Sequence, residues 1–369
     1  MWVSGRGDQP MKITFNPATL LTRIKAIGAA NYVGLVAKGQ ALMVLGGNAH
    51  CRVRAMWSCA VDADGSAWVT AGPLVAALTA SKGDEATIAV GPEKLAYRCG
   101  HVELDLPVSV SSEDWTQLPP SNVADPFVVV SGEALRAAIS IVDTIPAKHT
   151  NDWMCGIGIK WDGNGLSLVA TDGKRIAEAC LLPSGEMKGE FDVATTPKYL
   201  CPVPNMTGDV ALRVNGSWLF IEHYDSDISA AVRLLERPMP GKVSEKLRES
   251  EKADSAQKVN LDSFRTAAAL IARNCVDDDV VKLETGDGEG QLSVATSVFQ
   301  QILPIEGEFA LERKVGLTAG YLHKALSTMP DCETVDIIVA DTKSPLAIMA
   351  SGDGITATVV IAQRYIDGN

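Results

Sequence analysis

The sequence predicts an α+β fold of three similar domains, in each of which two helices pack on antiparallel sheets. Segments with apolar residues at helical spacing occur at three wide intervals along the chain. A second, shorter helical stretch follows each of them. Runs of alternating apolar and polar residues, bounded by Gly, Asn and Asp, lie between and after these stretches. The unit recurs at a period of roughly 120 residues, which we interpret as an internal repeat.

The first helix of each unit has a recognisable start. The three segments are NPATLLTRIKAIGAA from Asn16, SGEALRAAISIVDTI from Ser131 and LDSFRTAAALIARN from Leu261. Asn, Ser and Asp side chains accept hydrogen bonds from the unpaired N–H groups that begin a helix. We therefore expect Asn16, Ser131 and Asp262 to be the N-caps.

The second helical stretch and the strands complete each unit. The second stretches are AGPLVAALTASKG from Ala71, TTPKYLCPVPNM from Thr195 and LTAGYLHKALSTMP from Leu317. Runs such as QALMVLGG, LSLVAT, WLFIEHY, DIIVAD and TATVVIA are typical of strands.

Two breaks in the pattern suggest the domain boundaries. SSEDWTQLPPSNVADP is rich in Pro and turn residues, and KVSEKLRESEKADSAQK is charged and poor in apolar residues, as in a solvated linker or an exposed helix. The predicted division is an N-terminal extension at 1–10 and three domains at 11–122, 123–250 and 251–369.

Composition restricts the class of protein. A hydrophobic fraction of 46% and a charged fraction of 21% are typical of soluble globular chains, and no run reaches the roughly 18 apolar residues of a membrane helix. The eight cysteines form no CxxC pair, so a reducing cytoplasm is expected. The net charge of −12 argues against a uniformly basic surface, but basic groups gathered in a channel remain compatible with it.

The run SLVATDGKRIAEA, from Ser167 to Ala179, resembles the bacterial β sliding clamp family, the processivity subunit of DNA polymerase III. The resemblance extends from Met11 to about Tyr365 through MKITF, LDLPVSVSSEDWTQLP, VGLTAGYLHKALSTM and SPLAIM. It implies a DNA-clamp fold and a head-to-tail homodimer, a ring of six domains. Such a ring would encircle double-stranded DNA and tether DNA polymerase and a clamp loader through a short peptide motif.

The resemblance also implies that helices line a central channel and present basic side chains to phosphates. Such contacts do not depend on DNA sequence and weaken with salt. For each basic residue the alternative is a solvated helix face, and for Trp153 it is ordinary packing. The expected DNA-binding residues are Arg23, Lys25, Lys82, Arg136, Lys148, Trp153, Lys198, Arg265, Arg273 and Lys324.

A hydrophobic groove for partner peptides is implied between the second and third domains. Gly173 would permit an unusual turn there, and the planar donors of Arg175 could hold the groove wall in place. Asp172-Gly173 also reads as a simple hairpin turn, and both interpretations can hold together. The C-terminal tail departs from the family pattern at Gln363. The expected groove residues are Met154, Thr171, Gly173, Lys174, Arg175, Ile176, Pro240, Tyr321, Pro345, Val359, Ile361, Ala362 and Gln363.

The contact that closes the ring is expected between domain one of one chain and domain three of the next. By resemblance it involves Arg98, Leu104, Leu106, Leu270 and Ile271. The matching stretch TSVFQQILPIEG is poor in acids, so we expect apolar packing to dominate this contact. Core burial is the alternative for Leu104 and Leu106.

Two other classes of function compete with a replicative clamp. An enzyme is disfavoured, because GDGEG and GNG lack phosphate-loop spacing and the five histidines lack metal-ligand spacing. We therefore expect no catalytic residues, metal or cofactor, and no membrane partner. The second alternative is a non-replicative clamp-fold paralogue or decoy that only binds partner proteins.

Overall fold

The structure is a computed structural model. It describes residues 10–27, 31–108, 118–122, 124–146, 153–200, 207–223, 227–251, 256–276, 279–286, 289–295, 300–308, 311, 314–339 and 344–364. The chain divides into two compact units. Unit 1 comprises Met1–Glu133, Ser184–Gly189 and Lys198–Leu234, and unit 2 comprises Ala134–Pro183, Glu190–Pro197 and Leu235–Asn369.

The order of elements repeats three times. Each repeat runs strand, helix, five strands, helix and three strands, and one more helix, α4 (Gly241–Glu251), separates the second repeat from the third. The first repeat contains β1 (Met11–Phe15), α1 (Pro17–Ala26), β2 (Tyr32–Lys38), β3 (Ala41–Gly47), β4 (Cys51–Ser58), β5 (Ala60–Ala63), β6 (Gly65–Thr70), α2 (Ala71–Ala80), β7 (Ala86–Val90), β8 (Lys94–Cys99) and β9 (Val102–Pro107).

The second and third repeats follow the same order. The second contains β10 (Phe127–Ser131), α3 (Gly132–Val142), the 3₁₀ turn η2 (Trp153–Cys155), β11 (Ile157–Trp161), β12 (Leu166–Thr171), β13 (Arg175–Leu181), β14 (Met187–Lys188), β15 (Phe191–Thr195), the 3₁₀ turn η3 (Pro197–Leu200), β16 (Asp209–Asn215), β17 (Trp218–His223) and β18 (Ile228–Arg233). The third contains β19 (Ala256–Asn260), α5 (Leu261–Asn274), β20 (Val280–Gly286), β21 (Glu289–Ala295), β22 (Gln300–Ile305), β23 (Gly307–Glu308), β24 (Val315–Thr318), α6 (Ala319–Thr328), β25 (Thr334–Val339), β26 (Leu346–Gly352) and β27 (Ile355–Ile361). The predicted α+β class is confirmed.

Sheets continue from one repeat into the next. In unit 1 a nine-stranded sheet has the order β14-β10-β16-β17-β18-β4-β3-β2-β6, so β18 of the second repeat pairs with β4 of the first. In unit 2 a second nine-stranded sheet has the order β15-β11-β12-β13-β27-β26-β25-β19-β23, and β13 pairs with β27. All of these pairings are antiparallel. The sequence pattern predicted the strands but not this continuity.

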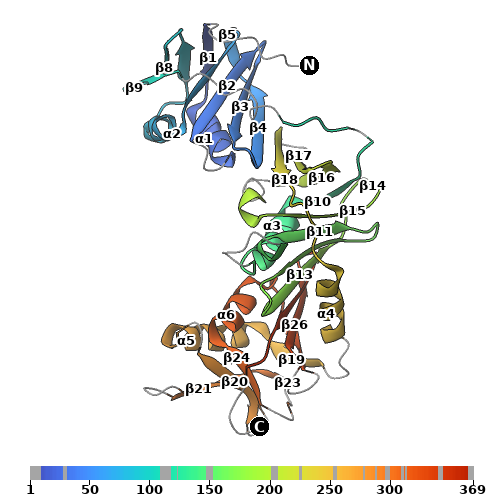
Figure 1. Cartoon of the computed structure of the whole chain (residues 1–369). Coiled ribbons are helices and arrows are strands. Elements are labelled where there is room, and N and C mark those ends of the chain that lie inside the picture. The colour runs from blue at the N-terminus through green and yellow to red at the C-terminus, as the bar shows by residue number, and fades with distance from the viewer. Residues whose placement is uncertain are drawn as a thin grey trace. The chain divides into compact units, whose positions relative to one another are not determined.

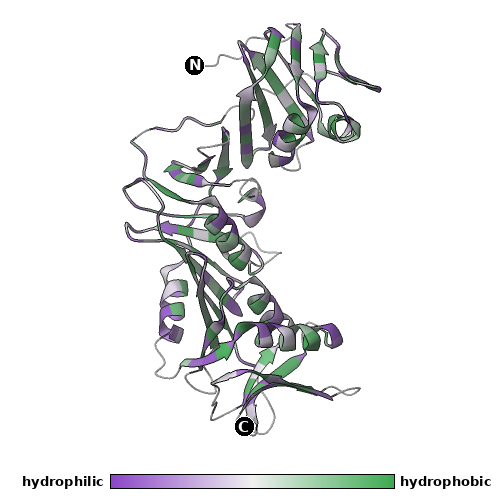
Figure 2. Ribbon diagram, turned by 180° about the vertical axis from the view of Figure 1, so that it is seen from behind, coloured by the Kyte–Doolittle hydropathy of each residue, from purple (hydrophilic) through white to green (hydrophobic). Residues whose placement is uncertain are grey.

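Each unit also contains a smaller sheet. Unit 1 has the order β5-β1-β7-β8-β9 and unit 2 the order β22-β21-β20-β24, so β9 and β22 are edge strands. Helices α1 and α2 pack on each other in unit 1, and α5 and α6 do so in unit 2 (Figure 1). Hydrophobic and hydrophilic residues are interspersed along these elements (Figure 2).

The helix starts were largely predicted. The Asn16 side chain accepts hydrogen bonds from Ala18 N and Thr19 N, so it caps α1 as expected. The predicted cap of α5 was wrong by two residues. Asn260, not Asp262, precedes the helix, and its Oδ1 accepts from Ser263 N at 2.8 Å. Asp262 lies within the first turn because Leu261, fully buried, is already helical.

The linker segment from Lys242 is partly a packed helix. On α4, Val243 and Leu247 are buried, while the lysines and most of the acids are exposed. None of the described helices is long and apolar enough to cross a membrane.

We predict that Asn260→Ala lowers the free energy of unfolding by about 1 kcal/mol, because the first-turn N–H groups of α5 lose their acceptor. Asp262→Ala is the matched control, with a smaller expected loss since its side chain is 90% exposed. Urea unfolding followed by circular dichroism measures both. An equal loss in the two variants would contradict the assignment of the cap.

Candidate partner-binding site

The TDGKR segment forms a tight turn between β12 and β13 in unit 2. Asp172 Oδ1 accepts hydrogen bonds from Lys174 N at 2.9 Å and from Arg175 N at 2.8 Å. The Thr171 hydroxyl donates to the Arg175 carbonyl at 2.7 Å. Gly173 has φ 84°, a conformation that a side chain disfavours. The predicted hairpin is therefore confirmed.

Arg175 is buried at the end of this turn. Its Nε and Nη2 donate to Asp172 Oδ2 at 3.0 and 2.8 Å, and its guanidinium lies over the Tyr321 ring, 4.2 Å from the centroid. Nη2 also donates to the Thr144 carbonyl. Within the described part of the chain, Nη1 is buried with no hydrogen-bond partner. A buried donor without an acceptor costs about 1–3 kcal/mol.

The end of the chain is fastened beside this turn. Ala362 N donates to the Lys174 carbonyl at 2.9 Å, and Arg364 N donates to the Gly316 carbonyl at 2.8 Å. The Gln363 side-chain amide donates to the Ser344 carbonyl. The structure thus brings the predicted residues Lys174, Ala362 and Gln363 together.

Apolar residues cover the neighbouring face of the nine-stranded sheet. Ile176 packs against a cluster of Val169, Met239 and Val243, so the first turn of α4 covers it. Pro240 precedes that turn, and its carbonyl accepts from Val243 N.

Other predicted groove residues fall into two groups. Thr171 is 4% exposed, Val359 1% and Ile361 0%, so these three side chains belong to the core. Val359 and Ile361 lie opposite Ala177 and Arg175 in the β13–β27 pairing. Both faces of β27 are buried here, since Thr358 and Val360 are each 4% exposed, and sequence resemblance did not fix this. Met154, on η2, and Pro345 are partly exposed.

Contacts that the sequence did not predict support the same surface. Asp172, Thr144 and Ser344 supply acceptors to the predicted residues. Only Asp172 had a sequence signal, because an acid before Gly-Lys-Arg is typical of a side-chain-capped turn.

The C-terminal end of α4 places Glu251 against the nine-stranded sheet of unit 2. The Thr358 hydroxyl donates to Glu251 at 2.9 Å, and Thr358 lies opposite Glu178 in the β13–β27 pairing. Burial is the main cause that raises the pKa of Glu178, and the negative charge of Glu251 raises it further. The positive charges of Arg248 and Lys160 act in the opposite direction. Burial likewise raises the pKa of Cys180 to about 12, so this thiol is not a nucleophile at neutral pH.

The predicted DNA-binding residues lie on or near helices of both units. Lys25 on α1, Arg136 on α3, Arg273 on α5 and Lys324 on α6 are exposed, as are Lys82 and Lys198. Arg23 is partly exposed. Lys148 lies outside the described residues, as does the side chain of Trp153.

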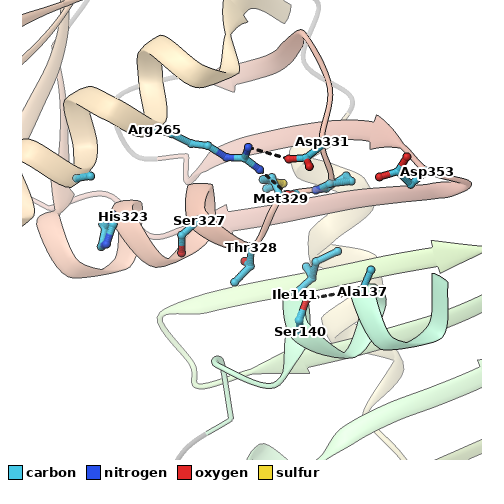
Figure 3. Close-up of a pocket in the computed structure, with 12 residues that line it drawn as sticks. Ala137, Ser140, Ile141, Arg265, His323, Ser327, Thr328, Met329, Asp331 and Asp353 are labelled. Atoms are coloured by element: carbon cyan, nitrogen blue, oxygen red, sulfur yellow. Dashed lines mark hydrogen bonds and ion pairs between the residues drawn. The ribbon is translucent and has the colours of Figure 1, made fainter. Parts of the chain in front are cut away.

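Arg265 is engaged within the protein. Its guanidinium donates to the Leu326 and Met329 carbonyls at 2.9 and 2.6 Å and pairs with Asp331 at 3.0 Å. It lies at a cavity of about 620 Å³ within unit 2, whose lining includes His323 and Ser140 (Figure 3). Because its donors bind α6 and the loop after it, Arg265 has a structural role that the sequence did not reveal.

The predicted ring contact separates into edge and core residues. Leu106 is 5% exposed and Ile271 1%, so both belong to the core, which for Leu106 was the alternative interpretation. Leu104, partly exposed, lies on edge strand β9, and Leu270 is 37% exposed. The edge strand β22 carries Ile302, 53% exposed, which the sequence analysis did not select.

Arg98 is paired with acids of its own sheet. Its Nη2 lies 2.9 Å from Asp105, which also binds Lys94 at 2.8 Å, and its Nε lies 3.5 Å from Glu103. The charge of Arg98 is therefore balanced along β9. On the edge strand β22, the polar residues are the uncharged Gln300 and Gln301.

Metal-ligating side chains do not cluster in the described parts of the chain. Among those residues no cluster of His, Cys, Asp or Glu could hold a metal ion, and the described cysteines are free thiols. The GNG segment is a hairpin turn in which Asp162 accepts from Asn164 N and Gly165 N.

The fold is that of solved bacterial clamps. A structure of the C. crescentus beta sliding clamp matches with a TM-score of 0.82 and 18% identity, covering 97% of this chain and 100% of that one. The chain has the sliding-clamp fold. A Pseudomonas aeruginosa DNA polymerase III subunit beta bound to griselimycin matches with a TM-score of 0.83 and 17% identity, covering 97% and 100%. A DNA polymerase sliding clamp from Bacillus subtilis matches with a TM-score of 0.83 and 14% identity, again covering 97% and 100%. No protein-family model and no curated protein matches the sequence.

We predict that Glu178→Gln raises the melting temperature at pH 8. The pKa of Glu178 is raised in the folded state, so the wild-type protein loses stability as the pH rises from the ordinary value of 4.5 through the folded value. The Gln variant does not ionise and avoids this loss. Below pH 4.5 the two melting temperatures should converge.

Glu249→Gln is the control, because Glu249 is exposed on α4, the helix that carries Arg248 and Glu251. Differential scanning calorimetry at pH 4 and pH 8 measures all three proteins. A Glu178→Gln variant less stable than wild type at pH 8 would show that the carboxylate stabilises the docking of α4.

Proposed function

We propose that this chain is a DNA sliding clamp that encircles double-stranded DNA and tethers a replicative DNA polymerase and other partner proteins. The observation that carries the proposal is the match to bacterial clamps along 97% of the chain with TM-scores of 0.82 and 0.83. A clamp needs no catalytic residue of its own, which agrees with a site built for binding.

The threefold element order supports the predicted domains at 11–122, 123–250 and 251–369. Three domains per chain make a six-domain ring when two chains join head to tail. The edge strands β9 and β22 suit that contact, since each has unpaired backbone groups on its outer side. Exposed Ile302 and Leu270, together with Leu104, would supply its apolar part.

Duplex DNA would lie against the helices. The exposed cations Lys25, Arg136, Arg273 and Lys324 provide contacts to phosphates without reading base sequence. The net charge of −12 does not prevent this, because the position of the basic groups on the helices matters more than the sum of all charges.

Partner proteins would dock at the surface formed by the 171–175 turn, Tyr321, Pro345 and the 362–364 segment. A short extended peptide is the ligand that suits it. Arg175 would hold the wall of this surface in place through its contacts with Asp172 and Tyr321. We infer a cytoplasmic location, in keeping with the free thiols.

We predict a species of twice the 39.1 kDa chain mass in light scattering. Ile302→Asp should shift it to monomer, because a carboxylate would be buried in an apolar contact. Since the charge of Arg98 is neutralised by an acid of its own sheet, the fraction of dimer should change little between low and high salt. Leu182→Asp is the control, as Leu182 is 74% exposed and lies on neither of the edge strands β9 and β22. A wild-type monomer at micromolar concentration would contradict the ring.

We predict that Arg175→Ala weakens polymerase binding roughly 30-fold, as loss of a central interface residue does. Weaker binding is measured as shorter product when the cognate polymerase copies a long primed circular template. Lys174→Asp, a change at an exposed position, tests the same surface without removing a buried side chain.

Lys188→Glu on β14 is the control and should leave product length unchanged. If wild-type protein lengthens no product with host or phage polymerases, the chain is a clamp-fold decoy. If it does and both surface variants are normal, polymerase binds elsewhere.

A further inference from the structure

The turn between β3 and β4 in unit 1 repeats the turn of the partner-binding surface. Asn48 Oδ1 accepts hydrogen bonds from His50 N at 2.8 Å and from Cys51 N at 3.0 Å. Asn48 N donates to the Cys51 carbonyl at 2.7 Å, as Asp172 N donates to the Arg175 carbonyl. The two turns therefore have the same hydrogen-bonding pattern.

The segment after β18 is fastened in the same way as the end of the chain. Arg233 N donates to the His50 carbonyl at 2.7 Å, as Ala362 N does to Lys174. The next residue, Leu234, donates its N–H to the Ser217 carbonyl at 2.9 Å. Its counterpart Gln363 reaches Ser344 with its side chain instead. A main-chain bond thus replaces a side-chain bond at one point of an otherwise repeated arrangement.

A tyrosine occupies the same place in both surfaces. Tyr199 is the third residue of η3, and Tyr321 is the third residue of α6. The His50 ring stacks on Tyr199 with centroids 5.0 Å apart and planes 11° apart, and the Cys51 thiol donates to the Tyr199 carbonyl. In the first surface the guanidinium of Arg175 lies over Tyr321.

The chemistry of the second surface differs from that of the first. Trp218 lies opposite Arg233 in the β17–β18 pairing, the place that Pro345 has before β26. The guanidiniums of Arg52 and Arg233 lie over the Trp218 ring, 5.1 and 5.5 Å from the centroid. Two guanidiniums stacked on one ring place positive charge at this surface, and the planar donors of a guanidinium match the geometry of a carboxylate.

The side chains concerned are accessible. His50 and Arg233 are exposed, and Tyr199 and Trp218 are partly exposed. Arg and Trp are the residues that dominate protein interfaces. Two cations on an acidic chain favour an acidic ligand, and the flat His50–Tyr199 stack favours an apolar or aromatic side chain beside it.

We propose that His50, Tyr199, Trp218 and Arg233 form a second docking site, which takes a short acidic peptide with an aromatic anchor from a partner protein. The proposal rests on the proposed function, because the first surface is its template. One chain would then hold two partners at once, with different peptide chemistry at each site.

The test measures the ¹⁹F NMR resonance of Trp218. The full-length protein is labelled with 5-fluorotryptophan, and Trp218→Phe identifies the ¹⁹F resonance of this residue. The probe is the capped hexapeptide Gly-Asp-Glu-Phe-Leu-Gly, and its neutral analogue Gly-Asn-Gln-Phe-Leu-Gly is the ligand control. We expect the acidic peptide to shift the Trp218 resonance saturably, with at least a tenfold weaker effect from the neutral analogue.

Arg233→Glu should abolish the shift, whereas Lys188→Glu, the same charge change elsewhere on the sheet, should not. Arg175→Ala should also leave it intact, so failure of the first surface in polymerase assays is distinguishable from failure of this site. The proposal is overturned if the acidic peptide leaves the Trp218 resonance unmoved, if both peptides act equally, or if only single-stranded oligo(dT) shifts it.

Discussion

The antiparallel pairing of β13 with β27, and of β18 with β4, is the constraint on which the rest of the structure depends. Each pairing joins two repeats through backbone hydrogen bonds, so a nine-stranded sheet replaces two shorter ones. The two smaller sheets take no part in these pairings, and each has an edge strand, β9 in unit 1 and β22 in unit 2, where a further strand can add. The ring that we propose would close by strand addition at these edges, the same kind of contact that joins the repeats within each unit.

The same pairing positions the candidate partner-binding surface. When β27 lies beside β13, its continuation meets the 171–175 turn, and Ala362 binds Lys174. Arg175 then lies between Asp172 and Tyr321, buried and with one donor unmatched. Strand pairing, rather than a local motif, therefore assembles residues from four separate stretches of sequence. Because β4 and β18 pair in the same way, the arrangement occurs a second time around His50, Tyr199 and Arg233.

Charge is distributed in agreement with this organisation. Arg98, Arg175 and Arg265 are each paired with an acid of their own unit, so three predicted functional cations have structural partners. The cations that remain exposed on the helices, such as Lys25 and Lys324, are those available to an outside anion. A chain with an excess of acids can thus keep a locally basic surface without being basic overall.

The sequence by itself determined the α+β class, the threefold repeat, the cap at Asn16 and the turn at Asp172-Gly173, because spacing and turn chemistry are local properties. Resemblance in the same residues predicted the clamp fold. Only the tertiary structure decided that Val359, Ile361, Leu106 and Ile271 are core, that Asn260 caps α5, and that Arg265 binds α6. Which face of a strand is buried, and which acceptor a long side chain reaches, depend on strands and helices distant in sequence, and no local pattern encodes those neighbours.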